Sequence, residues 1–516
     1  MNRPNRNLSQ DVAPRHRVQS LSWQGGVPSG ADKGFAALLH RIEATRGAAL
    51  LEGAERVRVE VPLESCDPLA WLVDRADSPT VYWASRDHSL EVVGVGVFQH
   101  FFERTPDKVR AALDHLERNL SGCGPRWRAF GAIAFDPARP GFACGGGFEP
   151  FAFVLPRVEV GRDSEGCWMA AYVRATDPTA WAHDVAAVHA LCRRRGAARA
   201  LPAGFCSLPG TEVARGEPPR APALAIEGLE QDGPRAQWGH AVGAALADIR
   251  AGAFQKVVLA RRAASRFDEG VDAIEVLRRL SAAEPRSYRF CLRPRPNLAF
   301  VGASPERLVL KSQRIVRSEA IAGTRRRDPD PALDVALAKA LLNSDKDRRE
   351  QAFVRDSVAE ALETLCVDTW STDGPELVQF ERVQHLWTGL GGALRPGVCL
   401  ADILAALHPT PAVCGFPRKA AQERLAALED FERGYYAGPV GWLGDGEAEL
   451  AVGIRSAHIE GSTVSLFAGA GIVNGSVPDD EWEEVNHKLA VFRSLLGFHR
   501  PASPPLQAGQ AQGQTP

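Results

Sequence analysis

A predicted strand meets a predicted helix in the segment Val464-Ser-Leu-Phe-Ala-Gly-Ala-Gly-Ile-Val-Asn-Gly-Ser-Val-Pro-Asp-Asp-Glu-Trp-Glu-Glu-Val-Asn-His-Lys488. The apolar residues of 464–468 favour a strand, and the pattern over 478–496 favours a long helix. On that helix Glu481, Glu484 and Lys488 lie on one face, because residues three and four apart are neighbours. Such a face can hold a hard cation and an anion bound to it, although a solvated Glu–Lys pair is the commoner outcome.

Strands and helices elsewhere are grouped in blocks and do not alternate strictly. Between residues 33 and 206 the expected strands are 57–61, 81–84, 90–98 and 130–135, and the expected helices are 108–120 and 177–194. From residue 237 onward the expected strands are 255–260, 288–292, 298–301, 308–310, 314–316, 438–443, 449–454 and 464–468, and the expected helices are 237–252, 331–342, 347–365, 417–428 and 478–496. This grouping predicts an α+β fold with antiparallel sheets.

Composition suggests two lobes with tails and a linker. The polar residues 1–32 and the Pro-, Gln- and Gly-rich residues 498–516 are expected to be disordered. Five prolines and many charges between positions 207 and 235 indicate a linker over 207–236. The expected domains are an N-terminal α+β lobe over 33–206 and a C-terminal catalytic lobe over 237–497.

The bulk composition is that of a globular protein. Of 516 residues, 45% are hydrophobic and 24% charged, and the net charge of −2 gives no field to attract nucleic acid or an anionic membrane. No apolar run approaches the roughly 20 residues that span a bilayer. Residues 1–32 show no secretory signal. The ten cysteines are scattered without a C-x-x-C pair, which disfavours a zinc or redox motif and predicts a cytoplasmic protein.

Further carboxylates open another predicted helix, in the sequence Ser344-Asp-Lys-Asp347-Arg-Arg-Glu350. Acidic residues in a first turn are favoured by the helix dipole, so capping explains them without any ligand. The alternative is that this turn supplies a third carboxylate to the cation suggested for Glu481 and Glu484. Mg²⁺ takes oxygen ligands, keeps several waters and typically uses one or two carboxylates with an anionic substrate.

Two ionisable residues lie in or just after apolar strands. Lys256 occurs in Phe254-Gln-Lys-Val-Val-Leu-Ala-Arg261, and Glu306 ends Gly302-Ala-Ser-Pro-Glu306. The simplest interpretations are solvent exposure of Lys256 and a turn pair between Glu306 and Arg307. If both side chains are buried, desolvation disfavours the charged form of each, which suits a general base and a general acid.

Three more patterns involve anion binding or a nucleophile. Phe467-Ala-Gly-Ala-Gly471 offers backbone N–H groups to a carboxylate, although a tight turn is the ordinary explanation. Arg455 could bind a carboxylate with two hydrogen bonds, or be a surface arginine. Gly397-Val-Cys399-Leu-Ala401 is similar to the nucleophile elbow of a glutamine amidotransferase but lacks the final Gly. Only 117 residues follow Cys399, too few for such a domain, so Cys399 is expected to pack.

Together and in this order, the motifs resemble those of the chorismate-utilising enzyme family. The matching elements, within about 237–497, are Gln255-Lys-Val-Val-Leu-Ala-Arg261, Gly302-Ala-Ser-Pro-Glu306, Ala320-Ile-Ala-Gly-Thr324, Ser344-Asp-Lys-Asp-Arg-Arg-Glu350, His408-Pro-Thr-Pro-Ala412, Tyr436-Ala-Gly-Pro-Val-Gly-Trp442, Ile454-Arg455, Phe467-Ala-Gly-Ala-Gly-Ile-Val473 and Glu481-Trp-Glu-Glu484. The resemblance implies a large α+β unit whose antiparallel sheets form a sandwich, with helices outside and the site between the sheets.

The resemblance also implies roles for individual residues. Glu350 and Glu484 match direct Mg²⁺ ligands, while Asp347 and Glu481 match positions that reach the ion through water. The ion would hold the ring carboxylate of chorismate. The positions that match substrate-binding residues are Thr324, His385, Arg455, Gly469 and Lys488. Position 345 departs from the pattern, because it is Asp where many relatives have Glu, and this could alter the helix start.

Lys256 distinguishes activities within the family. Relatives that add ammonia, such as anthranilate synthase, have Gln here, so Lys256 implies that water is the nucleophile and that no glutaminase subunit is a partner. Lys256 would activate water for attack at C2 of the ring while Glu306, on the opposite face, protonates the departing C4 hydroxyl. The implied function is that of an isochorismate synthase of menaquinone or siderophore biosynthesis, with chorismate as substrate and Mg²⁺ as cofactor.

Two alternatives stay open. A salicylate synthase keeps the same Lys and Glu but goes on to eliminate pyruvate. Ala320 argues against it, since these lyases more often have Pro before Ile-Ala-Gly-Thr. A chorismate-binding subunit without activity would have lost an acid or a base, and every expected one is present.

Overall fold

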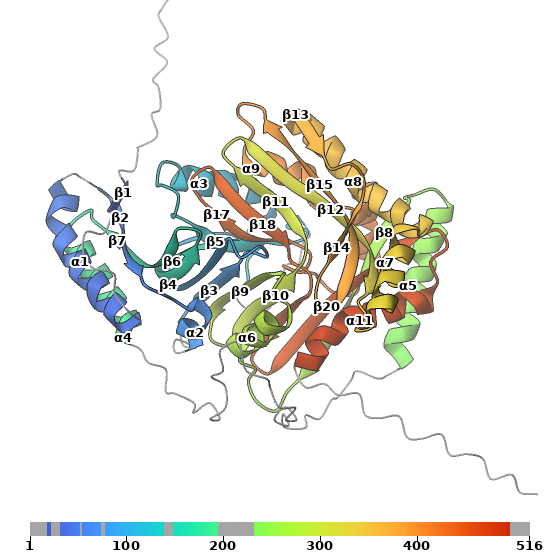
Figure 1. The fold of residues 1–516 in the computed structure, drawn as a ribbon, viewed down its shortest axis with the longest axis horizontal. Helices are drawn as coiled ribbons and strands as arrows, with labels where there is room; N and C mark the ends of the chain where they lie inside the picture. Colours follow the sequence, from blue (N-terminus) through green and yellow to red (C-terminus); the bar gives the residue numbers. More distant parts are fainter. Residues whose placement is uncertain are drawn as a thin grey trace, which may run out of the picture.

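The computed structural model of the chain describes residues 18–21, 31–51, 54–73, 78–138, 148–193 and 232–495 (Figure 1). The strands are β1 (Val18–Leu21), β2 (Arg56–Leu63), β3 (Thr80–Ala84), β4 (Leu90–Glu103), β5 (Ala129–Ile133), β6 (Phe151–Asp163), β7 (Gly166–Arg174), β8 (Lys256–Arg266), β9 (Tyr288–Arg295), β10 (Leu298–Ser304), β11 (Arg307–Ser312), β12 (Ile315–Arg326), β13 (Cys366–Ser371), β14 (Glu376–Gln379), β15 (Val383–Leu394), β16 (Gly415–Phe416), β17 (Pro439–Leu443), β18 (Glu447–Val452), β19 (Ser456–Glu460) and β20 (Thr463–Val473). The helices are α1 (Ala31–Leu51), α2 (Pro68–Val73), the 3₁₀ helix η1 (Pro106–Lys108), α3 (Val109–Leu120), α4 (Pro178–Arg193), α5 (Asp232–Arg250), α6 (Ala273–Ala283), α7 (Pro331–Leu342), α8 (Asp345–Leu365), α9 (Leu400–Leu407), α10 (Arg418–Leu428) and α11 (Pro478–Leu495).

Strand β6 is shared by two sheets. One of its edges pairs with β4 over residues 151–163, whereas the other pairs with β5 over 151–154 and with β7 over 158–163. The first sheet runs β1-β2-β7-β6-β4-β3-β9-β10-β19-β20-β8-β16. The second runs β4-β6-β5-β17-β18-β11-β12-β15, with β13 and β14 on the far edge of β15. Among the described strands, every pairing except β1 with β2 is antiparallel.

Helices cover the outer faces of the two sheets. Helix α8 packs on β12 and β15, α11 on β20, and α5 on β8 and β20. At the opposite end of the molecule, α1 contacts β2 and α4 contacts β7 (Figure 1). The predicted α+β fold, with antiparallel sheets inside and helices outside, is therefore confirmed.

The two predicted lobes are joined by hydrogen bonds. Strand β3 pairs with β9 and β5 pairs with β17, so in each sheet a block of strands from before the predicted linker is joined to a block of strands from after it. A buried aromatic cluster joins strands from both sides of the predicted linker and contains Trp83, Phe130, Trp168, Tyr288 and Trp442. The two predicted lobes therefore share both sheets, and the division at 207–236 stays a prediction.

Smaller differences concern element ends. Within the predicted tail 1–32, residues 18–21 form β1 along β2, and α1 begins at Ala31. Residues 232–236 of the predicted linker belong to α5; the preceding linker residues and the predicted tail 498–516 lie outside the described residues. Helix α8 begins at Asp345 and not at 347, because Ser344 Oγ accepts a hydrogen bond from the Asp347 N–H at 3.3 Å and caps the first turn. In the part of the chain that the structure describes, no helix is both long and apolar enough to cross a membrane.

The shared sheets predict that the C-terminal lobe does not fold by itself. A chain that begins at residue 232 lacks β3 and β5, which leaves the edges of β9 and β17 unpaired and exposed. We expect it to aggregate, whereas the full chain gives one species in size-exclusion chromatography. Monodisperse 232–516 with a cooperative thermal transition would contradict this prediction.

Candidate functional site

A cavity of about 210 Å³ lies between strands of the two sheets and beside the first turns of α8 and α11. Most of the residues predicted from the sequence to form a site line this cavity. They are Glu306, Thr324, Asp347, Glu350, His385, Arg455, Gly469, Glu481, Glu484 and Lys488. The remaining one, Lys256, lies directly behind Glu350, so the structure brings the whole predicted set together.

Lys256 points inward from β8 and is 0% exposed. Its Nζ donates a hydrogen bond to Glu350 Oε1 at 3.0 Å. The neighbouring strand β20 leaves room for this contact only because position 471 is glycine. A Cβ at Gly471 would lie 2.7 Å from Glu350 Oε1 and 3.1 Å from Lys256 Cε. Lys256 therefore does not adopt the solvent-exposed orientation that the sequence allowed.

Glu306 lies in the link between β10 and β11 and is 4% exposed. Its backbone is fixed on both sides, since its N–H donates to Ser304 Oγ at 3.2 Å and its carbonyl accepts from the Val452 N–H at 3.1 Å. Burial, together with the nearby Glu319 carboxylate, raises the pKa of Glu306 to about 8. Its carboxyl group is therefore mostly protonated at neutral pH and can donate a proton.

The expected turn pair between Glu306 and Arg307 does not form. The Arg307 guanidinium instead donates to Tyr288 Oη at 2.8 Å. Glu306 thus remains available to the cavity.

His385 and Arg455 form a hydrogen-bonded pair at the cavity wall. Arg455 Nη2 lies 3.1 Å from His385 Nε2, and because arginine can only donate, Nε2 must be the acceptor. The ring proton is then on Nδ1, which lies 3.1 Å from the Gly323 carbonyl and 3.0 Å from Thr324 Oγ1. Burial, with Arg455 beside it, lowers the pKa of His385 to about 3, so the ring is neutral.

Local backbone geometry places these side chains. The pairing of β12 with β15 shifts register between Ala322 and Thr324, and Gly323 in between has φ +71°. This bulge turns Thr324 toward His385. Arg455 also adopts a left-handed backbone, with φ 47°, at the turn between β18 and β19. A non-glycine residue in this conformation is unusual and is often found at functional sites.

Helix α11 presents the predicted face of acidic and basic residues to the cavity. Lys488 Nζ donates to Glu484 Oε1 and to the Gly469 carbonyl, both at 2.8 Å. The Lys488 ammonium lowers the pKa of Glu484, which keeps this carboxylate ionised. Burial raises the pKa of Glu481, whose nearest cation is Lys346 at 3.6 Å. The pair lines the cavity while 42% of the Glu484 side chain and 35% of the Lys488 side chain stay exposed.

The acidic residues fit a hard cation by their chemistry. Glu350, Glu484, Glu481 and Asp347 supply only oxygen donors, the type that Mg²⁺ prefers. Glu481 Oε1 is buried without a hydrogen-bond partner, as is expected of an oxygen that has another ligand. The other carboxylates each face a basic side chain, with Asp347 Oδ2 2.7 Å from Arg325 Nη2.

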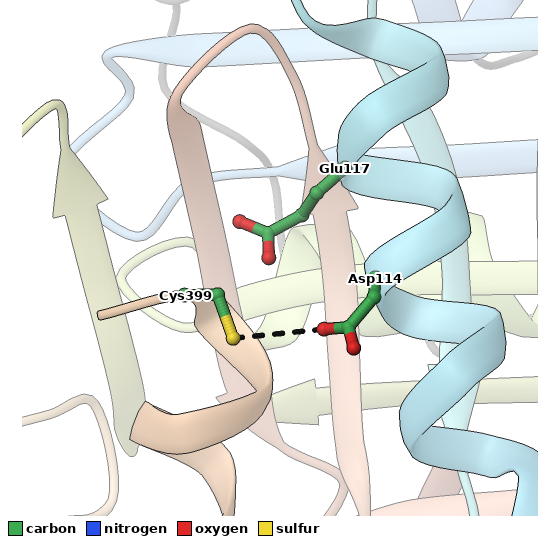
Figure 2. Close-up of side chains that lie close together, drawn as sticks. All are labelled: Asp114, Glu117 and Cys399. Atoms are coloured by element: carbon green, nitrogen blue, oxygen red, sulfur yellow. Dashed lines mark hydrogen bonds between the residues drawn. The ribbon is translucent and has the colours of Figure 1, made fainter. Parts of the chain in front are cut away.

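A different group of potential metal ligands lies away from the cavity. Figure 2 shows Asp114 and Glu117 of α3 facing Cys399, with Cys399 Sγ 3.5 Å from Asp114 Oδ1. Glu117 Oε2 accepts from the Leu400 N–H at 3.0 Å, and Asp402 Oδ2 accepts from the Cys399 N–H at 3.0 Å. These carboxylates satisfy the first N–H groups of α9, so the group is explained as a helix cap between α3 and α9.

Three cavity residues carry no distinctive signal in the sequence. Arg325 and Lys346 face Asp347 and Glu481, and each is a chain neighbour of a motif residue, Thr324 or Asp347. Basic residues are common next to acidic motifs, so nothing in their position marked them. Gly471 is part of the motif Phe467-Ala-Gly-Ala-Gly471. The requirement for glycine at this position becomes clear only when β20 is placed against α8.

An antiparallel α+β sandwich that holds a buried lysine and a protonated glutamate beside a carboxylate-lined cavity defines an acid–base enzyme acting on a small anionic substrate. Residues 44–497 match the family described as chorismate binding enzyme, and the chain belongs to that family.

Similar proteins cover most of the chain. The chloroplastic isochorismate synthase of Catharanthus roseus is 34% identical over 424 residues, which are 81% of this chain and 70% of that protein. The isochorismate synthase MenF of Bacillus subtilis is 30% identical over 483 residues, 90% of this chain and 96% of that protein. The solved structure of the menaquinone-specific isochorismate synthase MenF from Escherichia coli covers 88% of this chain and 100% of its own, with a TM-score of 0.69 and 26% identity.

The contact at Gly471 predicts a large effect of one methyl group. In Gly471→Ala the new Cβ displaces Glu350 from Lys256, and a misplacement of catalytic groups by about 1 Å can lower turnover about 10²-fold. Gly243→Ala is the control, because a Cβ there meets nothing within 4 Å. Steady-state kinetics with chorismate check this, and equal turnover of both variants would contradict the contact.

Proposed function

We propose that this chain is a Mg²⁺-dependent isochorismate synthase, which interconverts chorismate and isochorismate. The observation that carries the proposal is the buried Lys256, which donates a hydrogen bond to Glu350 at the wall of the cavity that the protonated Glu306 also lines. The similar proteins named isochorismate synthases, which cover most of the chain, support the same activity. Because water is the nucleophile, we expect no glutaminase subunit, and the scattered cysteines lead us to place the enzyme in the cytoplasm.

Lys256 and Glu306 divide the proton transfers. Lys256 takes a proton from water as its oxygen forms a bond to C2 of the ring. The ring double bond shifts, the C4–O bond breaks, and Glu306 donates its proton to the departing hydroxyl, which leaves as water. Protonated Glu306 suits this role because its pKa of about 8 keeps the proton on it at neutral pH. In the reverse direction the two residues exchange roles.

The cations of the cavity bind the substrate's carboxylates. Arg455 can offer two parallel N–H donors, and Lys488 adds a positive charge beside Gly469. His385 stays neutral and holds the Arg455 guanidinium in place through Nε2. The geometry therefore favours a small dianion over a neutral ring.

The metal would be held by acidic residues of two helices. We propose Glu350 and Glu484 as direct ligands, with Asp347 and Glu481 contacting the ion through water. When bound, Mg²⁺ would neutralise the ring carboxylate and so favour attack on the ring.

Product analysis tests the proposed function. Purified enzyme with chorismate and Mg²⁺ should reach a mixture of chorismate and isochorismate, and added isochorismate should be converted back. Exchange of one allylic hydroxyl for another leaves the bonding nearly unchanged, so the equilibrium constant should lie near unity. Stoichiometric pyruvate in a lactate dehydrogenase assay, with fluorescent salicylate, would instead identify a salicylate synthase.

The general base is tested by Lys256→Ala and Lys256→Gln. Both should lose about 10²–10⁴-fold in turnover while chorismate binding is largely kept, because a positioned base contributes that much. Lys311→Gln is a matched control, since Lys311 is another buried strand lysine and donates to the Gly446 carbonyl, outside the cavity. Near-wild-type turnover of Lys256→Ala would exclude Lys256 as the base.

The metal ligands are tested by titrating Mg²⁺ against activity and by isothermal calorimetry. Glu350→Gln and Glu484→Gln should each raise the half-saturating Mg²⁺ concentration, because each removes a charged oxygen ligand. Glu360→Gln on α8 and Glu483→Gln on α11 are controls, as both residues are exposed on the same helices. An unchanged half-saturating Mg²⁺ concentration in both variants would contradict the assignment of Glu350 and Glu484 as metal ligands.

A further inference from the structure

One residue of the N-terminal lobe reaches the link that carries Glu306. Arg86 lies in the turn between β3 and β4, and its Nη1 donates to the Pro305 carbonyl at 2.6 Å. This carbonyl belongs to the peptide bond directly before Glu306. The backbone that carries the proposed general acid is thus held from the other side of the linker, across 219 residues of sequence.

The same guanidinium is fixed by a buried carboxylate on β12. Glu319 is 2% exposed and accepts from Arg86 Nη1 at 2.7 Å, while Arg86 Nη2 donates to its second oxygen. Glu319 also accepts from the Arg307 N–H at 2.7 Å and from Trp387 Nε1 at 2.9 Å. Donors from three separate elements therefore fix this carboxylate, and a bidentate pair fixes the guanidinium in turn.

The turn that carries Arg86 is itself anchored. Ser85 Oγ donates to Glu449 Oε2 on β18 at 2.6 Å, and the Arg86 guanidinium lies over the Tyr288 ring at 5.4 Å from its centroid. Tyr288 Oη donates to Glu449 Oε1 at 3.1 Å. The turn thus contacts β9, β12 and β18 at once, which makes Arg86 a rigid support.

We propose that Arg86 and Glu319 are positioning residues for the general acid, so that the N-terminal lobe completes the active site. Arg86 holds the Pro305 carbonyl and thereby the direction of the Glu306 side chain, and Glu319 holds Arg86. The inference rests on the role proposed above for Glu306. Neither residue lines the cavity, so both act through Glu306 and do not touch the substrate.

The pair also sets the charge around Glu306. The charged and titratable groups that face it are Glu319, Lys256, Arg86, Arg455 and Tyr436. After burial, the Glu319 carboxylate is what most raises the pKa of Glu306, and the Arg86 guanidinium lowers it. Removal of either charge must therefore shift the proton affinity of Glu306, and in opposite directions.

The test measures kcat and kcat/KM for chorismate against pH in four variants of the full chain. They are Arg86→Gln, Glu319→Gln, the double variant and Arg86→Lys. Arg126→Gln is the matched control, because Arg126 is 19% exposed against 16% for Arg86, and it pairs with Glu60, Asp163 and Glu165, none of which lines the cavity. Circular dichroism and thermal melting of each variant show whether it is folded.

We expect the alkaline limb of the profile to move to higher pH in Arg86→Gln and to lower pH in Glu319→Gln. Turnover should fall about 10- to 10²-fold in Arg86→Gln, because the Pro305 carbonyl loses its donor. In the double variant the limb returns toward that of the wild type while turnover stays low. Arg86→Lys keeps the charge but loses the planar fork that reaches Pro305 and both Glu319 oxygens, so its limb stays in place and its turnover falls.

The proposal is overturned if folded Arg86→Gln and Glu319→Gln keep the wild-type limb and the turnover of Arg126→Gln. It is also overturned if both limbs move the same way. If Arg86→Gln does not fold, Arg86→Lys decides, and wild-type turnover in that variant overturns the proposal. Failure of the proposed function looks different, because then the wild type makes no isochorismate, or Glu306→Gln keeps full activity.

Discussion

Strand β6 exchanges one neighbour for another along a single edge, from β5 over residues 151–154 to β7 over 158–163. A strand has only two hydrogen-bonding edges, so this exchange forces the sheet to divide in two while β4 continues along the other edge. Each branch then runs through C-terminal strands, to β8 and β20 in one and to β12 and β15 in the other. The cavity lies between these C-terminal strands of the two branches, and α8 and α11 border it.

Burial of charge is the second constraint, and it follows from the first. Charged side chains that are partly removed from water at the cavity wall are stabilised by an opposite charge or a ligand. Lys488 faces Glu484, and Arg325 faces Asp347. These pairs leave the cavity with cations for an anionic substrate and carboxylates for a metal ion. Glu306 has no such partner among the described residues and is therefore protonated, as a general acid requires.

The N-terminal lobe has an active role in this arrangement. None of the motifs quoted from the sequence lies in it, yet β3 and β5 pair directly with C-terminal strands in the two sheets. The turn after β3 then reaches the backbone beside Glu306 through Arg86. A lobe that only covered the catalytic part would tolerate loosely packed contacts. Because the N-terminal lobe shares both sheets with the C-terminal lobe and holds the link that carries Glu306, the two lobes must fold together.

The sequence was sufficient to predict features that depend only on residues close together in the chain. The face formed by Glu481, Glu484 and Lys488 follows from helical spacing alone, and the grouping of strands and helices gave the fold class. The inward direction of Lys256 was not readable, because either side of a strand can face the core until its neighbours are in place. Its contact with Glu350, 94 residues away, and that of Arg86 with Glu319, 233 residues away, exist only once the two sheets have formed. Spacing along the chain carries no information about such pairs, since the path between them is decided by which strands share hydrogen bonds.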